Sequence, residues 1–284
     1  MNPAAILAVV VSFNGGQKTV ETVMALLGQV GHVHIVDNGS GPESTEPLRR
    51  LADLPGISVD YLPANRGIGH ALNLGLARAR EGGHGWLLTM DQDSRASAGM
   101  ISAFCGAHDA NPGCVCFTPT LVVNGHQETG SDREVAYAIT SGNLVKLEVF
   151  DRIGPFNSEM FIDCVDFDFS LRLRGAGWNI RQVGAAILYH ELGERHSAPG
   201  ILGRFYTLHS PLRRYYMYRN FFLLARLHFL AFPGFIIKFA IAHLILLLLI
   251  PFFDKNPWVS YSAIGKGILD FTLGRFDGCT RSIG

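Results

Sequence analysis

A regular alternation in the first hundred residues constrains the fold more than any other feature of the sequence. Segments 19–28 and 68–80 have the apolar spacing of helices that face a core. Around them lie short apolar runs typical of buried strands, at residues 6–12, 33–36, 58–62 and 86–90. Such alternation indicates parallel strands joined by crossover helices. The sequence therefore predicts an α/β fold with a mostly parallel, doubly wound central sheet.

Polar residues follow each of the four predicted strands. In a doubly wound sheet, ligands bind beyond the carboxyl ends of the strands, so these residues are the first candidates for a binding site. Each group taken alone is typical of a turn or a helix cap. Four groups at one sheet edge instead favour a shared pocket. In strand order they are Ser12 and Asn14, then Asp37, then Asn65, Arg66 and Gly67, then Asp91, Gln92 and Asp93.

Two carboxylates, Asp91 and Asp93, directly follow the predicted strand 86–90. Carboxylates two residues apart on a turn can bind one hard cation, and Mg²⁺ or Mn²⁺ held in this way takes its other ligands from water and phosphate. The alternative is an Asx turn with Ser94 as a helix cap. The strand and the neighbouring polar groups favour a metal site that suits a diphosphate.

Residues 94–200 are less regular. They predict strands near 115–118, 138–140 and 187–189 and a helix over 165–174. We therefore expect the sheet to be mixed in this part of the chain.

The charge balance changes near residue 200. Residues 1–200 hold 14 basic and 21 acidic side chains, whereas residues 201–284 hold 10 basic and 3 acidic ones. Over the whole chain the charges cancel, so there is no electrostatic reason to expect nucleic-acid binding. We expect a globular domain over 1–200 and a separate region over 201–284.

The C-terminal region combines arginine and aromatic residues over 204–226 with an apolar run over 239–253. The first segment suits a membrane headgroup interface. The apolar run is shorter than the ~20 residues that a clean span needs. An interfacial or re-entrant membrane anchor is therefore the favoured interpretation, with a true span, or a buried core or homodimer helix, as alternatives.

The five cysteines form no C-x-x-C pair, which argues against a disulfide framework or a zinc knuckle and predicts a reducing compartment. The first residues lack the basic start of a signal peptide. We therefore expect the globular domain to be cytosolic.

The motifs resemble, in order and spacing, those of a known family. They are VVVSFN at 9–14, VDNGS at 36–40, NRGIG at 65–69, DQD at 91–93 and SGN at 141–143. This series is similar to the family 2 glycosyltransferases, which are inverting enzymes of the GT-A fold. Segment 161–178 and YYMYRN at 215–220 are most similar to the rhamnosyltransferase branch, so the resemblance covers roughly residues 5–222.

The resemblance implies a nucleotide-sugar site in the half of the domain over about 1–95 and an acceptor half over 96–200. Asp37 would accept the ring N–H of the base, and Ser12 and Asn14 would line the base and the ribose. Donor contacts are also implied for Asn65, Arg66, Gly67, Asp91, Gln92, Ser141 and Gly142.

The resemblance also implies a metal site. Asp93 would be the main ligand of Mg²⁺ or Mn²⁺, and Asp91 would contact the ribose or a metal-bound water. His190 follows the predicted strand 187–189 and matches a family position near the metal or the diphosphate, although a single histidine is often structural.

In an inverting transfer, a general base takes the proton of the attacking hydroxyl. Asp166 aligns with that base, with Asp163 and Asp168 as rivals; the alternative for Asp166 is a helix first-turn acid. Tyr218, Arg219 and Asn220 would contact a lipid diphosphate acceptor or else only pack a helix.

The resemblance thus implies transfer of a sugar, L-rhamnose from dTDP-rhamnose, to a lipid-linked glycan for bacterial surface polysaccharide, at the cytoplasmic face of the inner membrane. The first alternative is a UDP-hexose donor. A nucleotidyltransferase is a weaker one, because residues 12–18 approximate a phosphate loop poorly. An inactive scaffold would be expected to lose Asp93 or Asp166, yet both are present.

Overall fold

The computed structural model describes residues 1–123, 126–127, 130–190 and 209–276. The chain divides into two compact units, each described here by itself. The first contains Met1–Ser158 and Phe169–Glu191, and the second contains Glu159–Asp168 and Leu192–Gly284. The second unit thus takes in a short segment that the sequence prediction assigned to the first domain.

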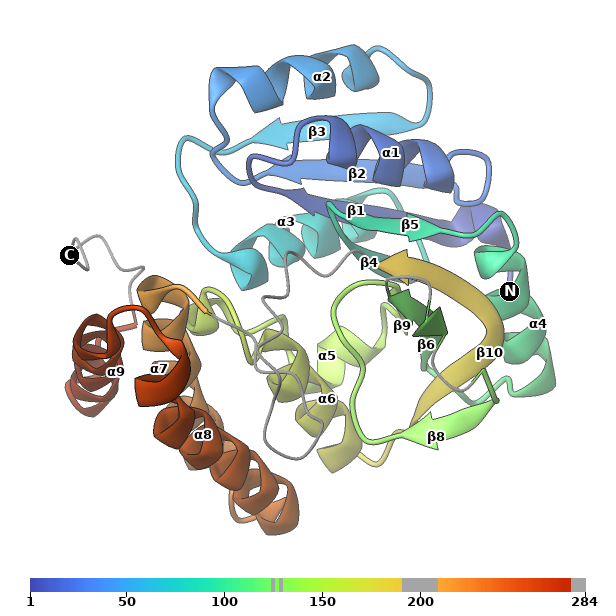
Figure 1. Ribbon diagram of the computed structural model, residues 1–284. Helices are drawn as coiled ribbons and strands as arrows, with labels where there is room; N and C mark the ends of the chain where they lie inside the picture. The colour runs from blue at the N-terminus through green and yellow to red at the C-terminus, as the bar shows by residue number, and fades with distance from the viewer. Residues whose placement is uncertain (124–125, 128–129, 191–208, 277–284) are drawn as a thin grey trace. The chain divides into compact units, whose positions relative to one another are not determined.

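The first unit is built on a ten-stranded mixed sheet with the order β3-β2-β1-β4-β9-β6-β10-β5, in which β7 pairs with β6 and β8 with β10 (Figure 1). The pairs β3-β2, β2-β1 and β1-β4 are parallel, and β9 is antiparallel to β4 and β6. The strands are β1 (Ile6–Ser12), β2 (His32–Asp37), β3 (Ile57–Tyr61), β4 (Trp86–Asp91), β5 (Ser94–Ala96), β6 (Cys116–Val123), β7 (His126–Gln127), β8 (Arg133–Val135), β9 (Asn143–Lys146) and β10 (Ile180–His190).

Helices cover both faces of the parallel strands. Along β1, Val10 belongs to the core cluster that includes Val23 of α1, whereas its neighbour Val9 faces α3, where Gly75 leaves no space for a side chain. The alternating side chains of one buried strand therefore pack against two helices. The helices that lie wholly in this unit are α1 (Gln17–Leu26), α2 (Pro42–Ala52), α3 (Ile68–Glu81), α4 (Met100–Ala110) and α5 (Val149–Ile153), and α6 (Val165–Gly175) crosses the boundary between the units.

The expected parallel sheet and the mixed region are confirmed, but the strand expected at 138–140 is wrong. This stretch is an irregular loop between β8 and β9. Its backbone is bound by side chains instead of a strand: Ala138 N donates to Ser170 Oγ at 3.2 Å, and the Thr89 hydroxyl donates to Thr140 O. The β-branched composition of the loop therefore does not lead to sheet pairing.

Within the described residues 209–276, the second unit forms the helices α7 (Pro211–His228), α8 (Pro233–Phe253) and α9 (Pro257–Thr272). Each begins with the proline that suits a first helical turn. Tyr218 of α7 packs in a small core with Ile250 of α8 and Ile264 of α9. The apolar segment is thus a continuous helix of 21 residues.

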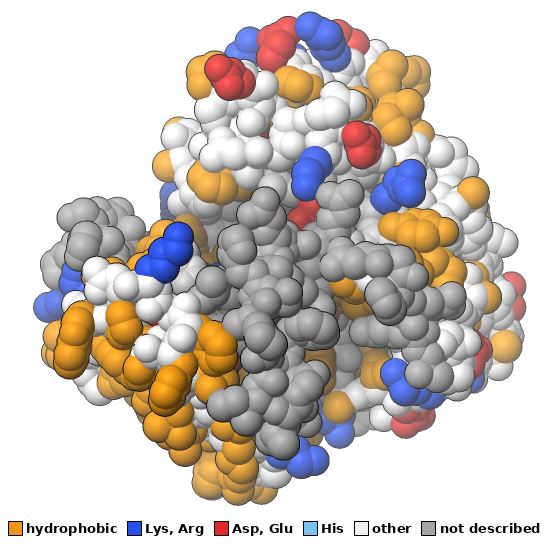
Figure 2. Space-filling view, in the orientation of Figure 1, with side chains coloured by type: hydrophobic (Ala, Val, Ile, Leu, Met, Phe, Trp, Pro, Cys, Tyr) orange, Lys and Arg blue, Asp and Glu red, His pale blue; other side chains and the backbone are white. Residues whose placement is uncertain are grey.

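Helix α8 is long and apolar enough to cross a membrane, with a mean hydropathy of 2.5 over its best window, of which 17% is buried. Figure 2 shows apolar side chains gathered over this helical unit. Six large apolar side chains of α8 are about half exposed or more: Ile237, Ile241, Leu244, Ile245, Leu248 and Phe252.

Candidate functional site

The carboxyl ends of β2, β1 and β4 bring three predicted site residues to one sheet edge. Ser12 ends β1 and pairs in register with Asp37, the last residue of β2. On the other side of β1, Val11 pairs with Asp91, the last residue of β4. Parallel neighbours end at the same edge, so the loops that follow these strands share one site.

The loops after β1 and β2 are joined by hydrogen bonds. Asn14 N donates to Ser40 Oγ at 2.7 Å, and Gly41 N donates to Asn14 Oδ1 at 3.0 Å. The Ser40 hydroxyl in turn donates to the buried Asp37 carboxylate. Asp37 and Asn14 are therefore held in place by the protein itself. Ser12 is also buried, and its hydroxyl is bonded to that of Thr19 at 2.9 Å.

The loop after β3 is bound through Asn38, a buried residue of the VDNGS motif that directly follows Asp37. Arg66 N donates to Asn38 Oδ1 at 2.8 Å, and Asn38 Nδ2 donates to Gly67 O at 3.2 Å. Gly67 N also donates to Asn65 Oδ1 at 2.9 Å. Gly67 has φ +85°, a conformation that favours glycine. The Arg66 side chain is exposed.

Gln92 lies between the two aspartates and connects them to the first loop. Its Oε1 accepts from Phe13 N at 2.6 Å, and its backbone carbonyl accepts from the Thr22 hydroxyl at 2.9 Å. Gly15 approaches the Gln92 side chain so closely that an added Cβ would lie 2.6 Å from Oε1. The structure therefore gives Gln92 a positioning contact within the protein, and the donor contact expected for it stays a prediction.

Asp91, Asp93 and His190 form a group whose ligand atoms lie within 4.8 Å of one another. His190 ends β10, which pairs with β5, so its Nδ1 lies 2.7 Å from Ser94 Oγ and 3.9 Å from Asp93 Oδ1. Burial and then the Asp93 charge raise the pKa of Asp91 to about 7. Two close carboxylates and an imidazole are a donor set that can hold a divalent cation, which would relieve this repulsion.

The predicted residues Ser141 and Gly142 lie beside the end of β4. Asp91 N donates to Ser141 Oγ at 3.1 Å, and Gly142 N donates to Thr89 O at 2.7 Å. Gly142 has φ +79°, and a Cβ there would lie 2.6 Å from Pro119. This turn therefore requires glycine and brings backbone to the sheet edge at which Asp91 ends β4.

The three candidate bases of the second unit differ in their partners. Asp168 is buried, with Oδ1 2.9 Å from His228 Nε2. Asp163 forms a bidentate pair with Arg213 at 3.0 and 3.3 Å. Asp166 is half-buried in the first turn of α6, and its Oδ1 accepts from Phe167 N at 2.9 Å. Asp163 is thus paired with an arginine and Asp168 with a histidine.

Tyr218, Arg219 and Asn220 are buried in α7. The Tyr218 hydroxyl donates to His243 O at 2.6 Å, and the side chains of Arg219 and Asn220 bind the backbone before α6. Their predicted contact with an acceptor therefore stays untested, and their observed partners lie within the second unit.

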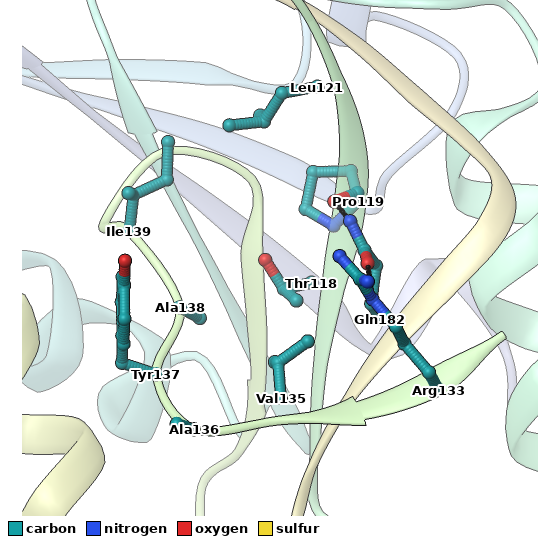
Figure 3. Close-up of a pocket in the computed structure, with 10 residues that line it drawn as sticks. All are labelled: Thr118, Pro119, Leu121, Arg133, Val135, Ala136, Tyr137, Ala138, Ile139 and Gln182. Carbon is teal, nitrogen blue, oxygen red and sulfur yellow. Dashed lines mark hydrogen bonds between the residues drawn. The ribbon is translucent and has the colours of Figure 1, made fainter. Parts of the chain in front are cut away.

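A cavity of about 510 Å³ lies in the first unit between β6, β8 and the loop at 136–139 (Figure 3). Its polar side chains include Arg133, whose Nε donates to Gln182 Oε1 at 2.7 Å, and Gln182 also donates to Pro119 O at 3.4 Å. None of the predicted site residues lines this cavity. It is therefore separate from the group at the end of β4.

The parallel strands, their joined loops and the group Asp91, Asp93 and His190 agree with the family to which the sequence is matched. The family model "Glycosyl transferase family 2" matches residues 7–161, more than half of the chain. The chain belongs to this family, which bears out the resemblance of its motifs.

Among curated proteins, the chain is similar to the dTDP-rhamnosyl transferase RfbF of Shigella flexneri, with 29% identity over 241 residues, which cover 78% of this chain and 80% of RfbF. Two solved structures share the fold. TarS 1-349 of S. aureus matches with a TM-score of 0.56 and 12% identity, over 96% of this chain and 73% of that one. GalNAc-T7 with UDP, GalNAc and Mn²⁺ matches with a TM-score of 0.57 and 13% identity, over 66% of this chain and 44% of that one.

Proposed function

We propose that this glycosyltransferase moves L-rhamnose from dTDP-rhamnose to a lipid-linked glycan acceptor in the synthesis of bacterial surface polysaccharide. The group Asp91, Asp93 and His190 beside the joined loops carries the proposal, because a cation at this edge suits a nucleotide diphosphate. The similarity to a dTDP-rhamnosyl transferase supports the choice of sugar and nucleotide.

The nucleotide would bind beyond β1 and β2. The Asp37 carboxylate would accept the ring N–H of the base, with Ser12 and Asn14 along the base and ribose. Arg66 lies in a loop whose backbone is bonded to Asn38, and its side chain is exposed. Its guanidinium would pair with the base or the diphosphate. Asn65, Gly67, Ser141 and Gly142 would border the donor through their loops.

Asp93, Asp91 and His190 fit a bound Mg²⁺ or Mn²⁺, whose charge would stabilise the diphosphate as it leaves. Because the Asp91 N–H donates to Ser141 Oγ, the backbone that carries this ligand would be held before the donor binds. Ser94 would keep the His190 ring in one orientation through the bond at Nδ1.

The transfer would be a single displacement with inversion. The acceptor hydroxyl oxygen forms a bond to the anomeric carbon while the bond from that carbon to the diphosphate oxygen breaks. Asp166 would take the hydroxyl proton, and the nucleoside diphosphate leaves with the bonding electron pair. Asp166 is preferred over Asp163 and Asp168 because it aligns with the base of the resembling family and lies in the first turn of α6.

The acceptor would be reached at a membrane surface. The exposed apolar side chains of α8 and the basic excess of residues 201–284 support a peripheral or re-entrant attachment to the cytoplasmic face of the inner membrane. On this view the domain over 1–200 carries the chemistry, and the region over 201–284 attaches it to lipid or pairs with a second copy of the chain.

Thermal melting tests the donor site. The protein is melted with Mg²⁺ or Mn²⁺ and with dTDP, UDP, GDP or ADP in turn, as wild type, as Asp93→Ala and as Asp53→Ala, which replaces an exposed aspartate outside the site. A nucleotide at about 100 times its Kd stabilises the folded protein by about 2.7 kcal/mol. We expect a metal-dependent rise with dTDP that Asp93→Ala abolishes and Asp53→Ala retains.

Transfer itself is measured with labelled dTDP-rhamnose and a lipid-linked glycan. Inverted rhamnosyl product in wild type and none in Asp93→Ala is the expected result. If only a UDP-hexose gave a melting shift and was hydrolysed, the donor would be a UDP-hexose instead of dTDP-rhamnose. A folded protein that responds to no nucleotide would overturn the proposal in favour of a scaffold.

A further inference from the structure

Two buried residues of α7, Arg219 and Asn220, hold the backbone that leads into α6. Asn220 Nδ2 donates to Met160 O at 2.5 Å and to Ile162 O at 2.6 Å. Arg219 Nη2 donates to Glu159 O at 2.6 Å, and its Nε donates to Asn220 Oδ1 at 3.0 Å. All of these groups belong to the second unit, so one network fixes the start of this segment.

The segment that this network holds has an unusual backbone. Phe161, Asp163 and Cys164 have φ values of +43°, +62° and +66°. The left-handed conformation costs a residue with a side chain roughly 1–2 kcal/mol. Three such residues within segment 161–164 therefore persist only where other contacts determine the backbone. Asn220 supplies such contacts, because its amide lies among the carbonyls of the same stretch, including Asp163 O at 3.1 Å.

Ring contacts support the same arrangement. Phe161 stacks on Tyr216 with centroids 4.8 Å apart, and the Arg219 guanidinium lies 4.9 Å from the centroid of the Tyr216 ring. The Asp163 side chain is bound to Arg213. The backbone, one aromatic ring and one carboxylate of the segment are therefore all bound by α7.

This segment sets where α6 begins. Cys164 O accepts the first helical bond, from Asp168 N at 2.9 Å, and the helix starts at Val165. Asp166 is the second residue of that helix and carries its carboxylate in the first turn. A change in the backbone at 161–164 would therefore move the Asp166 carboxylate directly.

We propose that Asn220, supported by Arg219, is a positioning residue for the glycosyl transfer. Its amide holds the left-handed residues within segment 161–164 in that conformation, so that Asp166 keeps the place from which it takes the acceptor proton. This inference rests on the proposed function of Asp166 as general base.

The first test compares Asn220→Ala with Ser260→Ala. The control removes a different buried hydrogen bond of the same unit, from Ser260 Oγ to Asp254 Oδ2 at 2.6 Å. A displacement of about 1 Å at a reacting group costs about 100-fold in rate, so we expect kcat of Asn220→Ala to fall by about that factor with the KM for the sugar nucleotide unchanged. Ser260→Ala should keep the wild-type kcat. Equal kcat in both variants would overturn the inference.

The second test repeats Asn220→Ala in an Asp166→Asn background. Residues that act as a unit have non-additive effects on rate, so the second substitution should cause no further loss of kcat. A loss that multiplies with that of Asp166→Asn would mean that Asn220 acts elsewhere, and the inference would be wrong. If Asp166→Asn alone kept wild-type activity, Asp166 would not be the general base, whatever the effect of Asn220→Ala.

Two further measurements separate positioning from general damage to the fold. Hydrogen exchange in Asn220→Ala should rise at residues 159–168 and stay at the wild-type level in β1 and β4. Adding Cys164→Gly to Asn220→Ala should partly restore kcat, because glycine adopts a positive φ without strain. Arg219→Lys, a smaller change, should give the same exchange pattern with a smaller loss of kcat. Unchanged exchange at 159–168 in both single variants would contradict the proposal.

Discussion

Asp91 is the residue at which protonation and cation binding compete. Burial and then Asp93 raise its pKa from 3.8 to about 7 in the folded protein. The native state therefore holds a proton that the unfolded chain has released, and the stability without metal falls as the pH rises from about 4 to about 7. A cation needs the ionised form, so its stabilising effect should grow over the upper part of this range.

Melting with and without Mn²⁺ at about pH 6 and about pH 8 checks this. We expect a clearly larger Mn²⁺-induced rise in Tm at the higher pH. In Asp91→Asn the rise should be smaller and should depend less on pH. An identical pH dependence in wild type and variant would exclude Asp91 as a ligand.

The proposed base gives a second prediction at the scale of residues. Asp166→Asn should lower kcat by about 10²–10⁴-fold, the usual contribution of a general base, with nucleotide binding intact in the melting assay. Asp168→Asn should mainly lower stability, because it removes a buried carboxylate from His228. If Asp168→Asn lost kcat and Asp166→Asn did not, the roles of the two acids would be exchanged.

The sequence predicted which residues reach the sheet edge better than it predicted their partners. Asp37, Asp91 and Asp93 follow strands, and strand ends can be inferred from apolar runs. The bonds of Asn38 and Gln92 join loops about 30 and 80 residues apart in sequence, a separation that no local pattern encodes. Their roles became visible only with the tertiary structure.

Among elements, the contact of α3 with β1 is close enough to be tested by adding one methyl group. A Cβ on Gly75 would lie 2.3 Å from Val9 Cγ2. Overpacking of this kind costs about 1–3 kcal/mol, so Gly75→Ala should lower the urea midpoint. Gly106→Ala in α4 is the matched control, because nothing lies within 4 Å of its added Cβ and alanine favours a helix by about 0.5–1 kcal/mol.

The two glycine variants should therefore move the free energy of unfolding in opposite directions. Equal effects would mean that α3 shifts to admit the methyl group.

The close approach also explains why the helix over 68–80 was predictable: its small and apolar residues face the sheet at helical spacing. Helix α2 was not predicted, because only Leu48 and Leu51 of its eleven residues are buried, which is too few for a clear period.

At the scale of the whole molecule, the uneven distribution of charge and of apolar surface predicts binding to lipid vesicles. Residues 201–284 combine 10 basic and 3 acidic side chains with the exposed face of α8. Each basic residue near an anionic surface contributes about 1 kcal/mol, and this attraction is screened by salt. Binding should thus be stronger to vesicles with anionic lipid than to neutral ones and weaker in high salt.

Co-flotation with vesicles measures this binding. The double variant Ile241→Lys and Leu248→Lys places charges on the exposed face of α8 and should lose binding to both vesicle types. Met24→Lys is the control, because Met24 is about half exposed on α1 of the first unit. A double variant that floats like wild type, or a wild type that is dimeric and does not float, would favour an α8 interface between copies of the chain.

The hydrogen bonds that join the loops after β1, β2 and β3 have a thermodynamic consequence. A loop that is already fixed loses little conformational entropy when its ligand arrives, whereas a loose loop must be ordered during binding. Substitution of Asn38 by alanine would remove no proposed contact with the nucleotide, yet it would free the loop that carries Arg66. Calorimetry should then record weaker dTDP binding with a less favourable entropy, so that part of the affinity of this enzyme resides in bonds formed before any donor is present.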